Sequence, residues 1–334
     1  MRQHGRQLNR SRGWIVLGVL LLAPPVWAGV PVVSDVLVTD VTDRSFSVVW
    51  TASEASTGSL NVFDGPLCTT VTAGITLVSH PVLNPDPAVK DAIKTAAEDK
   101  GILKVQVSGL AAAAPYCVQT VTTSKSTLEQ PVAPAVPQNV TTQIQVTRTR
   151  TIAPSPDLLP FANDVIAHPL YAPDQTTAVT GGIVAMGVLN LLGQSLSNIV
   201  ASVVGDGGAA PMTLTDLNNL FDPVNLQTVN LLGSGSERLR LLEYRGLAGC
   251  KLERFRKVPT DLGLAEIKAP AACFNSADFD CTDRVNILDV LRVAGGFGSR
   301  AGDFCYNPDL DVIVSSNVNI LDVLAVAGRF GLTP

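Results

Sequence analysis

Apolar and polar residues alternate in short segments over the first half of the chain. The alternating positions are Val36, Val38, Phe46, Val48, Trp50, Val105, Val107, Tyr116, Val118 and Thr120. A period of two is typical of strands with one buried face. The spacing of these strands predicts a β-sandwich over residues 29–155.

Helical periodicity interrupts these strands once. Asp86 is a favourable N-cap, Pro87 suits the first helical position, and Gly101 can end the helix. The apolar residues between them share one face: Val89, Ala92, Ile93 and Ala96. We therefore expect a helix over residues 87–100, inserted on the sandwich. It would serve as a lid over one open end or as a binding appendage, and the lid is the favoured interpretation.

Two short motifs in this region carry a family resemblance. Residues 45–52, Ser-Phe-Ser-Val-Val-Trp-Thr-Ala, resemble the B strand of a fibronectin type III domain with its core tryptophan. Leu110 followed by Tyr116 resembles the leucine and tyrosine that open the F strand and form the tyrosine corner. The resemblance implies an Ig/fibronectin-like β-sandwich, and the inserted helix departs from the family.

Residues 160–268 continue with short apolar runs between Gly, Pro, Asn and Asp. Five or more such runs predict a second β-sandwich. The uncharged stretch 175–205 is long enough to suggest a membrane span, but amides and hydroxyls lie at its centre. Burying them in lipid without partners would cost several kcal/mol. Two strands, at 183–189 and 198–204, joined by a turn at Gly193 are the better prediction.

Basic residues gather near the end of this middle region. They are Arg238, Arg240, Arg245, Lys251, Arg254, Arg256 and Lys257. Such a zone is suited to an anionic glycan. Because leucines alternate with Arg238 and Arg240, we favour the interpretation of a strand with one solvated face.

The C-terminal region contains an internal repeat. Residues 285–298 recur at 318–331, 33 residues later, with 12 of 14 positions identical. Each copy is an acidic loop followed by a short helix with one apolar face. Two such half-units can bury those faces only against each other.

The acidic loops have the spacing of a calcium site. A twelve-residue loop supplies Ca²⁺ with oxygen ligands from positions 1, 3, 5, 7, 9 and 12. In the first copy these ligands are Asp278, Asp280, Thr282, the Arg284 carbonyl, Asn286 and Asp289. If two residues are inserted after Val312, those of the second copy are Asp309, Asp311, Ser315, the Asn317 carbonyl, Asn319 and Asp322.

Duplicated loop–helix units with Asp at position 12 resemble a type I dockerin, a calcium-dependent module that binds cohesin domains in its family. Thr or Ser at position 5, and Asp283 or Ser316 at position 6, depart from the Asp and Gly usual there. The resemblance implies Ca²⁺ at both loops, bound more weakly at the second. It also implies that positions 10 and 11 choose the partner, and these are apolar here: Ile287, Leu288, Ile320 and Leu321. The alternative is a duplicated helical hairpin that is held by disulfides and does not bind metal at full occupancy.

The first 28 residues have the features of a secretory signal peptide. Four arginines precede the ten-residue apolar run 14–23, and Val26-Trp27-Ala28 suits a cleavage site. The run has about half of the roughly 20 residues that a membrane anchor needs. We therefore expect a secreted or cell-surface protein that begins at Gly29 and has no membrane span after cleavage.

Export makes disulfides the expected state of the six cysteines. Two lie near the N-terminus and four near the C-terminus, which suggests pairing within modules. Cys68 with Cys117 is the natural first bridge. The remaining four allow three connectivities: Cys250, Cys273, Cys281 and Cys305.

Net charge and composition narrow the possible functions. The mature chain has 20 basic and 29 acidic residues, a formal charge of −9 that disfavours nucleic acid. We find no nucleophile elbow, no zinc-protease motif and no phosphate loop, and we expect His80 and His168 to be surface residues. Aromatic residues, which a glycan platform needs, make up only 5% of the chain. We therefore expect no catalytic activity.

These patterns predict a mainly β protein with two Ig/fibronectin-like β-sandwiches and a small α-helical dockerin-like domain over residues 272–334. The leading hypothesis is a secreted, non-catalytic modular binding or scaffold protein. Its dockerin-like module, stabilised by Ca²⁺, would tether it to a cohesin-like protein or a cell-surface component. The alternative is a secreted polysaccharide-binding or polysaccharide-degrading protein with the middle sandwich as its glycan module. A third hypothesis makes the tail a folding clamp without a partner.

Overall fold

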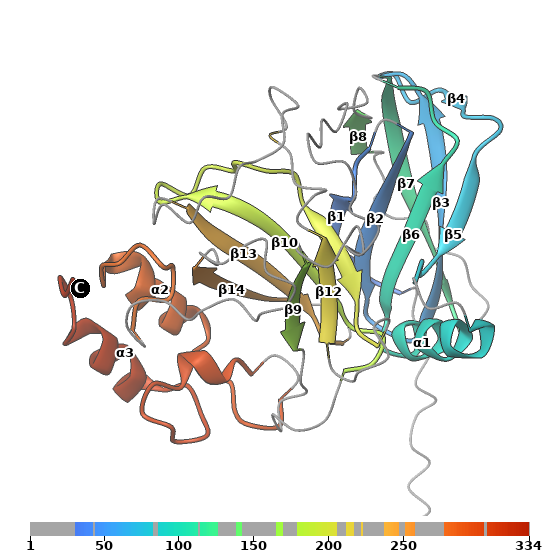
Figure 1. Ribbon diagram of the computed structural model, residues 1–334. Coiled ribbons are helices and arrows are strands. Elements are labelled where there is room, and N and C mark those ends of the chain that lie inside the picture. Colours follow the sequence, from blue (N-terminus) through green and yellow to red (C-terminus); the bar gives the residue numbers. More distant parts are fainter. Residues whose placement is uncertain are drawn as a thin grey trace, which may run out of the picture.

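The computed structural model describes thirteen segments of the chain: 31–42, 44–82, 86–112, 114–125, 138–141, 165–169, 179–205, 212–216, 222, 237–246, 251–257, 277–303 and 306–333. The expected signal peptide and the expected domain boundaries at 155, 160, 268 and 272 lie outside these segments. Within them, no helix is both long enough and apolar enough to cross a membrane. The described residues are mainly β (Figure 1).

The N-terminal region forms two four-stranded antiparallel sheets, as the alternating pattern predicts. The first has the order β1 (Val33–Thr39), β2 (Ser45–Ala52), β6 (Ile102–Ser108), β5 (Thr76–Ser79). The second has the order β4 (Thr70–Val71), β3 (Ser56–Asp64), β7 (Pro115–Ser124), β8 (Gln138–Thr141). Their facing sides share one apolar core, so this region is a β-sandwich.

Trp50 and Tyr116 lie in this core, as the sequence indicates. The Trp50 indole is fully buried, and its Nε1–H donates to the Thr122 hydroxyl at 3.0 Å across the sandwich. The Tyr116 hydroxyl accepts the Ala111 N–H at 2.9 Å, a side-chain-to-backbone bond that fixes the start of β7. Cys68 and Cys117 form the expected disulfide between loop and strand.

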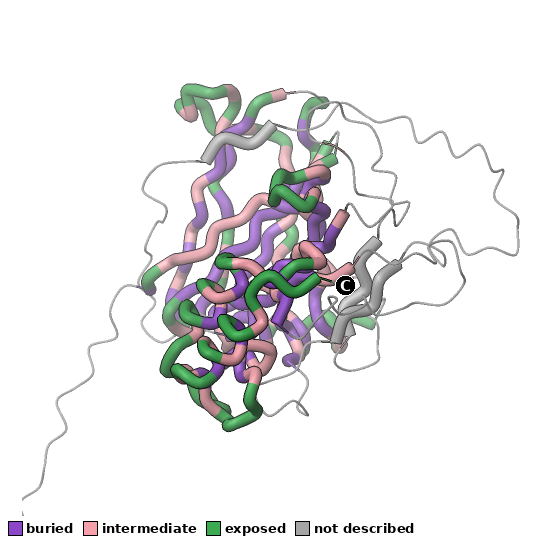
Figure 2. The backbone as a smooth tube through the Cα atoms, turned by 90° about the vertical axis from the view of Figure 1, so that its left-hand side faces the viewer, coloured by how far each residue is buried: buried purple, intermediate pink, exposed green. Residues whose placement is uncertain are grey.

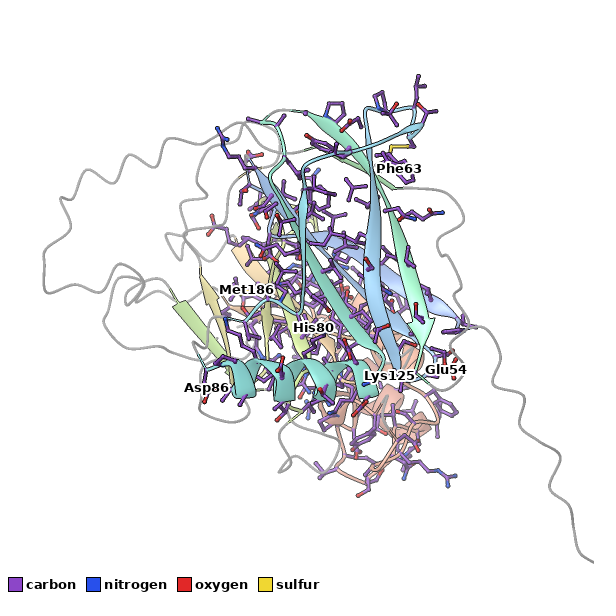
Figure 3. All side chains as sticks on the ribbon, turned by 90° about the vertical axis from the view of Figure 1, so that its right-hand side faces the viewer. Glu54, Phe63, His80, Asp86, Lys125 and Met186 are labelled. Atoms are coloured by element: carbon purple, nitrogen blue, oxygen red, sulfur yellow. A yellow bond between two sulfur atoms is a disulfide. The ribbon has the colours of Figure 1, made fainter. Side chains whose placement is uncertain are left out.

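Helix α1 (Pro87–Asp99) follows the sandwich strand β5 in the chain. The Asp86 side chain caps it by accepting the Ala88 N–H at 2.9 Å. Asp86 lies at one end of α1 and Lys125 at the other (Figure 3), where the Lys125 Nζ is 2.8 Å from Asp99. Ile93 and Ala97 on its inner face are buried, so the helix covers the end of the sheet layers.

The middle region contributes a third four-stranded antiparallel sheet. Its order is β11 (Val200–Val203), β10 (Ile183–Asn190), β13 (Glu237–Tyr244), β14 (Lys251–Lys257). A two-stranded pair, β9 (Val165–Pro169) with β12 (Met212–Asp216), accompanies it. The expected hairpin is confirmed, since β10 and β11 pair antiparallel with Ile183 opposite Val203.

This third sheet packs on the outer face of the first. Val49 and Ile102 of the sandwich, Ile93 of α1, and Ile183 and Tyr244 of the middle sheet belong to one buried cluster. The predicted half-buried strand at 45–52 is therefore buried on both faces, and buried backbone, purple in Figure 2, runs through the middle of the molecule. A period of two cannot reveal this, because it reports only which residues are apolar, and Ser47 and Thr51 on the outer face are small and polar.

An ion pair between buried Lys104 and half-buried Asp40 joins the two layers. The Lys104 Nζ donates to the Ala201 carbonyl at 2.6 Å and lies 2.8 Å from Asp40 Oδ2. Asp40 in turn accepts the Ala201 N–H at 2.8 Å. Strand β11 of the middle sheet is thereby held to the sandwich by polar contacts as well as by the apolar cluster.

His80 is buried in the structure, so its prediction as a surface residue is wrong. The ring lies beside α1 (Figure 3), with Nε2 2.8 Å from the Ile102 carbonyl and Nδ1 2.9 Å from the Ser79 hydroxyl. The following proline hid this, because His-Pro suggests an exposed turn. His168 lies in β9, where the side chains are outside the described part of the structure.

The C-terminal repeat forms two short helices, α2 (Ile287–Gly295) and α3 (Ile320–Ala327), with a 3₁₀ turn at Pro308–Leu310. Their inner faces meet in a separate small core that includes Val293 and Val326. We call residues 277–333 the C-terminal module. It lies beside β13 and β14, on the side away from the first sandwich (Figure 1).

Candidate metal centre

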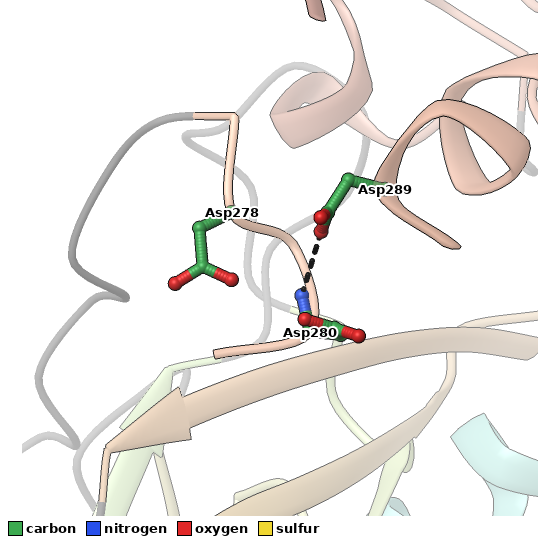
Figure 4. Close-up of side chains that lie close together, drawn as sticks. All are labelled: Asp278, Asp280 and Asp289. Atoms are coloured by element: carbon green, nitrogen blue, oxygen red, sulfur yellow. Dashed lines mark hydrogen bonds between the residues drawn. The ribbon is translucent and has the colours of Figure 1, made fainter. Parts of the chain in front are cut away.

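Three carboxylates of the first acidic loop converge in the structure. Asp278, Asp280 and Asp289 each place one oxygen within 4.8 Å of the others, and all three residues are buried. Asp278 and Asp280 come from the loop, and Asp289 comes from the first turn of α2 (Figure 4). This is the one group of three metal-ligating side chains found among the described residues.

Backbone N–H groups hold two of these carboxylates in place. Asp289 accepts the Phe279 N–H and the Asn286 N–H, both at 2.7 Å. Asn286 completes a capping box, since its own side chain accepts from the start of α2. Asp278 accepts the N–H groups of residues 282 and 283, both at 3.1 Å. The loop therefore wraps around the carboxylates, and the helix start fixes position 12.

The remaining predicted ligands of the first loop join the same network. The Thr282 hydroxyl donates to Asp280 Oδ1 at 2.7 Å, and the Asn286 amide lies 3.3 Å from both the Thr282 hydroxyl and the Arg284 carbonyl. The six predicted ligand residues of the first loop therefore lie close together in one hydrogen-bonded loop. Their donor atoms are hard oxygens, the set that Ca²⁺ prefers.

Buried carboxylates this close repel one another. The pKa of Asp278 is raised to about 7, chiefly by burial; the Thr282 N–H opposes the rise, and the carboxylates of Asp289 and Asp280 add to it. Burial likewise raises the pKa of Asp289. Oδ2 of Asp280 is buried without a hydrogen-bond partner. A divalent cation would supply the missing hydrogen-bond-like partner and more positive charge than the neighbouring Arg238 guanidinium, 3.6 Å from Asp280 Oδ2, so the first loop fits Ca²⁺.

The second loop adopts a register that differs from the expected one. Asp311 accepts the N–H groups of Ser315 and Ser316 at 2.8 and 2.7 Å, four and five residues onward, as Asp278 does in the first loop. Asp322 accepts the Asn319 N–H at 2.8 Å, as Asp289 accepts that of Asn286. The offset is 33 residues throughout. Asp311 rather than Asp309 is therefore at position 1, and the two-residue insertion after Val312 is absent.

In this register the second loop does not fit a cation well. Position 3 is Ile313, whose N–H bonds Asp322 but whose side chain offers no oxygen. Ser315, Asn317 and Asn319 bond to one another at positions 5, 7 and 9. Two carboxylates remain where the first loop has three.

Asp309 has a different role from the expected one. Its Oδ2 lies 3.4 Å from Arg254 Nη1 and 3.2 Å from Arg256 Nη2, both on β14. It therefore joins the C-terminal module to the middle sheet instead of lining the second loop.

Most basic residues of the middle region form such ion pairs, and the prediction of a solvated strand face is wrong for the two that are buried. Arg238 and Arg245 are buried. Charge pairs link the strands to the module or to buried Glu243: Arg238 with Asp280, Arg245 and Arg254 with Glu243, Lys257 with Asp283, and Glu253 with Arg292. The signal available in the sequence was the complementary charge of 238–257 and 278–322.

Each copy of the repeat also exposes the same apolar side chains, three on its helix and one just after it. The four matched pairs are Ile287 and Ile320, Leu288 and Leu321, Leu291 and Leu324, and Phe297 and Phe330, all between 53% and 59% exposed. The predicted partner-binding residues are therefore accessible, and two further pairs that the sequence analysis did not assign extend the apolar surface.

Of the four C-terminal cysteines, Cys281 is described and is disulfide-bonded. Cys250, Cys273 and Cys305 lie outside the described residues, so their connectivity stays as predicted. The sulfur of Cys281 belongs to the buried cluster with Leu189 and Phe255 of the middle sheet.

Comparisons with known proteins give little further guidance. The chain matches no protein-family model. It matches no curated protein either. Two solved structures are similar, an N-terminal and a C-terminal interface mutant of a type II cohesin–X-dockerin complex from Acetivibrio cellulolyticus. Each is 12% identical and covers 51% of this chain and 97% of the matched chain, with TM-scores of 0.20 and 0.18. At such TM-scores the likeness supports no argument.

Proposed function

We propose that the chain is a secreted, non-catalytic binding protein whose C-terminal module holds a protein partner through the apolar faces of α2 and α3. The observation that carries this proposal is the duplicated exposed face. Four apolar side chains at matched positions of the two copies, three on each helix and one just after it, are exposed to nearly the same extent. Side chains three or four residues apart on a helix are neighbours, and contiguous exposed apolar patches mark interaction sites.

The chemistry of the faces favours a partner with a complementary apolar surface. Leu288 and Leu321 directly follow Ile287 and Ile320, so each helix begins with two apolar side chains. The fully buried core of a protein interface is more apolar than the rest of the protein surface. The resemblance of the repeat to a dockerin gives the partner class: a cohesin-like β-sandwich protein or another cell-surface component.

We further propose that Ca²⁺ at the first loop stabilises this module. When bound, the ion adds positive charge beside Asp278, Asp280 and Asp289, of which Asp280 lies 3.6 Å from the Arg238 guanidinium. The chain's own residues fix the position of the site, because the capping box at Asn286 ties it to the first turn of α2. Calcium would thereby order the helix that begins with Ile287 and Leu288.

Secretion is supported by the N-terminal sequence and by the cysteine chemistry. The Cys68–Cys117 bridge and the bonded Cys281 suit an oxidising compartment. The alternative of a glycan-binding middle region is not favoured. Of its five aromatic residues, Tyr244 and Phe255 are buried and unavailable as a sugar platform.

The test is a capture experiment with the mature chain from Gly29. The chain is immobilised and exposed to the extracellular fraction of the producing cells, in calcium and in chelator, and bound proteins are identified by mass spectrometry. We expect capture of a β-sandwich protein in calcium, and its loss in the double variant Leu288→Glu/Leu321→Glu.

Leu192→Glu is the matched control, since Leu192 is equally apolar and 85% exposed but lies in the β10–β11 turn. It should leave capture intact. Equal capture by the double variant, or no specific capture by the wild-type chain, would contradict the proposal.

A further inference from the structure

A guanidinium from the middle sheet reaches the first acidic loop. Arg238 of β13 donates through Nη1 to the Asp280 backbone carbonyl. The same Nη1 lies 3.6 Å from Asp280 Oδ2. Both side chains are buried, at 6% and 3% exposed, so solvent screens this pair weakly. Asp280 occupies position 3 of the loop, one of the three carboxylates of the candidate calcium site.

The guanidinium is held in this place by its surroundings. It lies over the Phe255 ring at 4.7 Å from the centroid, and Arg292 of α2 lies at 4.2 Å from the same ring. Arg292 is itself paired with Glu253 at 3.2 Å. Stacking of this kind fixes the plane of a guanidinium, so Arg238 cannot simply turn away from the loop.

We propose that Arg238 sets the calcium affinity of the first loop. It is the loop's internal counter-ion, which partly neutralises Asp280 before the metal arrives and opposes the metal when it binds. The inference rests on the proposed calcium site and deepens it by naming a regulating residue outside the twelve-residue loop.

The physical reason is competition for one carboxylate. A single charge within about 4–6 Å changes the proton affinity of a carboxylate by roughly 10- to 1,000-fold. A divalent ion feels the same charge at least as strongly, because Coulomb energy scales with the product of charges. Calcium held by Asp280 would compete with the Arg238 guanidinium for that carboxylate, and it would weaken the Arg238–Asp280 contact.

The coupling is reciprocal. If Arg238 lowers the calcium affinity by some factor, calcium lowers the stability of the contact between Arg238 and the loop by the same factor. Calcium loading would therefore loosen the C-terminal module from β13. The distance between the tethered partner and the sandwich layers would become less fixed as calcium rises.

The experiment measures calcium affinity of the mature chain by titration calorimetry. Arg238→Met keeps an apolar stem against Phe255 and removes the charge, and we expect its affinity to be at least about 10-fold tighter than wild type. Arg238→Lys keeps a positive charge and should stay within about threefold of wild type. Arg240→Met is the matched control, because Arg240 lies on the same strand but pairs with Glu253 at 2.5 Å.

Each outcome decides between the proposals. Tighter binding by Arg238→Met alone, or binding by Arg238→Met where wild type shows none, supports the inference. If a folded Arg238→Met binds calcium no more tightly than wild type, the role of Arg238 is overturned but the calcium site is not. The same conclusion follows if Arg238→Lys tightens binding as much as Arg238→Met does. Absence of binding in both wild type and Arg238→Met overturns the calcium site as well. If Arg238→Met does not fold, Arg238→Gln, which retains an amide donor for the Asp280 carbonyl, takes its place.

Discussion

The hydroxyl of Tyr306 donates a 2.7 Å hydrogen bond to Asp311 Oδ2 inside the second loop. Both residues are buried. Burial disfavours the Asp311 carboxylate, but hydrogen bonds from Tyr306, Ser315 and Ser316 outweigh it and hold the pKa of Asp311 below its ordinary value. In the first loop the pKa of the matching Asp278 is raised instead. Donors of the protein thus outweigh burial at Asp311 in the second loop, whereas burial outweighs them at Asp278 in the first.

This contrast predicts one bound calcium per chain. Native mass spectrometry of the mature chain in calcium should show a single ion, and Asp278→Ala should remove it. Ile313→Asp restores a carboxylate at position 3 of the second loop and should raise the stoichiometry to two, most readily together with Tyr306→Phe. Two ions in the wild-type chain would refute the assignment of the second loop.

The buried imidazole of His80 predicts loss of stability in acid. Burial lowers the pKa of His80 to about 4; the Ile102 carbonyl opposes this, and Lys94 and Lys104 add to it. The unfolded chain, with an ordinary pKa near 6.5, binds the proton more readily. The contribution of the neutral His80 ring to the free energy of unfolding is therefore fully present above about pH 6.5. It falls by about 3 kcal/mol as the pH drops to about 4.

Denaturant unfolding at pH 7.0 and pH 4.5 tests this contribution. His80→Gln keeps a donor for the Ile102 carbonyl but does not titrate. The difference in unfolding free energy between wild type and variant should shrink or reverse on acidification, and groups that titrate in both proteins cancel. A difference that is independent of pH would show that His80 does not control acid stability.

The backbone of Gly181, in the middle region, lies directly against helix α1. Its φ is +78°, and a Cβ there would lie 2.5 Å from the Ala97 nitrogen. Gly65, with φ +69°, has open space around it. Thermal unfolding should show that Gly65→Ala costs about 1–2 kcal/mol for the backbone conformation alone. Gly181→Ala should cost a further 1–3 kcal/mol or so for the clash; equal losses would mean that the contact yields without cost.

Val314 occupies a backbone conformation that β-branched residues avoid. Its φ is +56° in the second loop, and its side chain is 86% exposed. Val314→Asn should therefore stabilise the module by about 1 kcal/mol, since Asn tolerates this region and no packing is lost. Val71→Asn, at an exposed strand position, should not stabilise the chain. A destabilised Val314→Asn would indicate a packing role that the exposure does not reveal.

The sequence predicted well those elements that local chemistry determines. The cap at Asp86, the proline at 87 and the glycine at 101 bracket α1, and the alternation around Trp50 marks a sandwich strand. The carboxylates of the first loop could be placed because their spacing follows a twelve-residue turn, and Asn286 caps α2 as the pattern implies.

Contacts between residues that are far apart in the sequence could not be predicted from local patterns. The predicted register of the second loop is wrong because Asp309 and Asp311 are both acidic and the spacing allows either at position 1. The N–H groups that bond Asp311 depend on the folded turn, which the sequence pattern does not show. Arg238 was assigned to solvent because alternation cannot show that a loop 42 residues away covers that part of the strand. The burial of His80 likewise could not be predicted, because the partner of its ring, the Ile102 carbonyl, lies 22 residues away in the sequence.

The cluster shared by the sandwich and the middle sheet also constrains how the chain can be made. During synthesis, the sheet face that carries Val49 and Ile102 is complete long before Ile183 and Tyr244 have been added. The nascent sandwich must therefore wait with an apolar face uncovered, a state prone to aggregation. A fragment that ends near residue 160 would keep that face permanently open, so the N-terminal half should require its C-terminal neighbour to remain in solution.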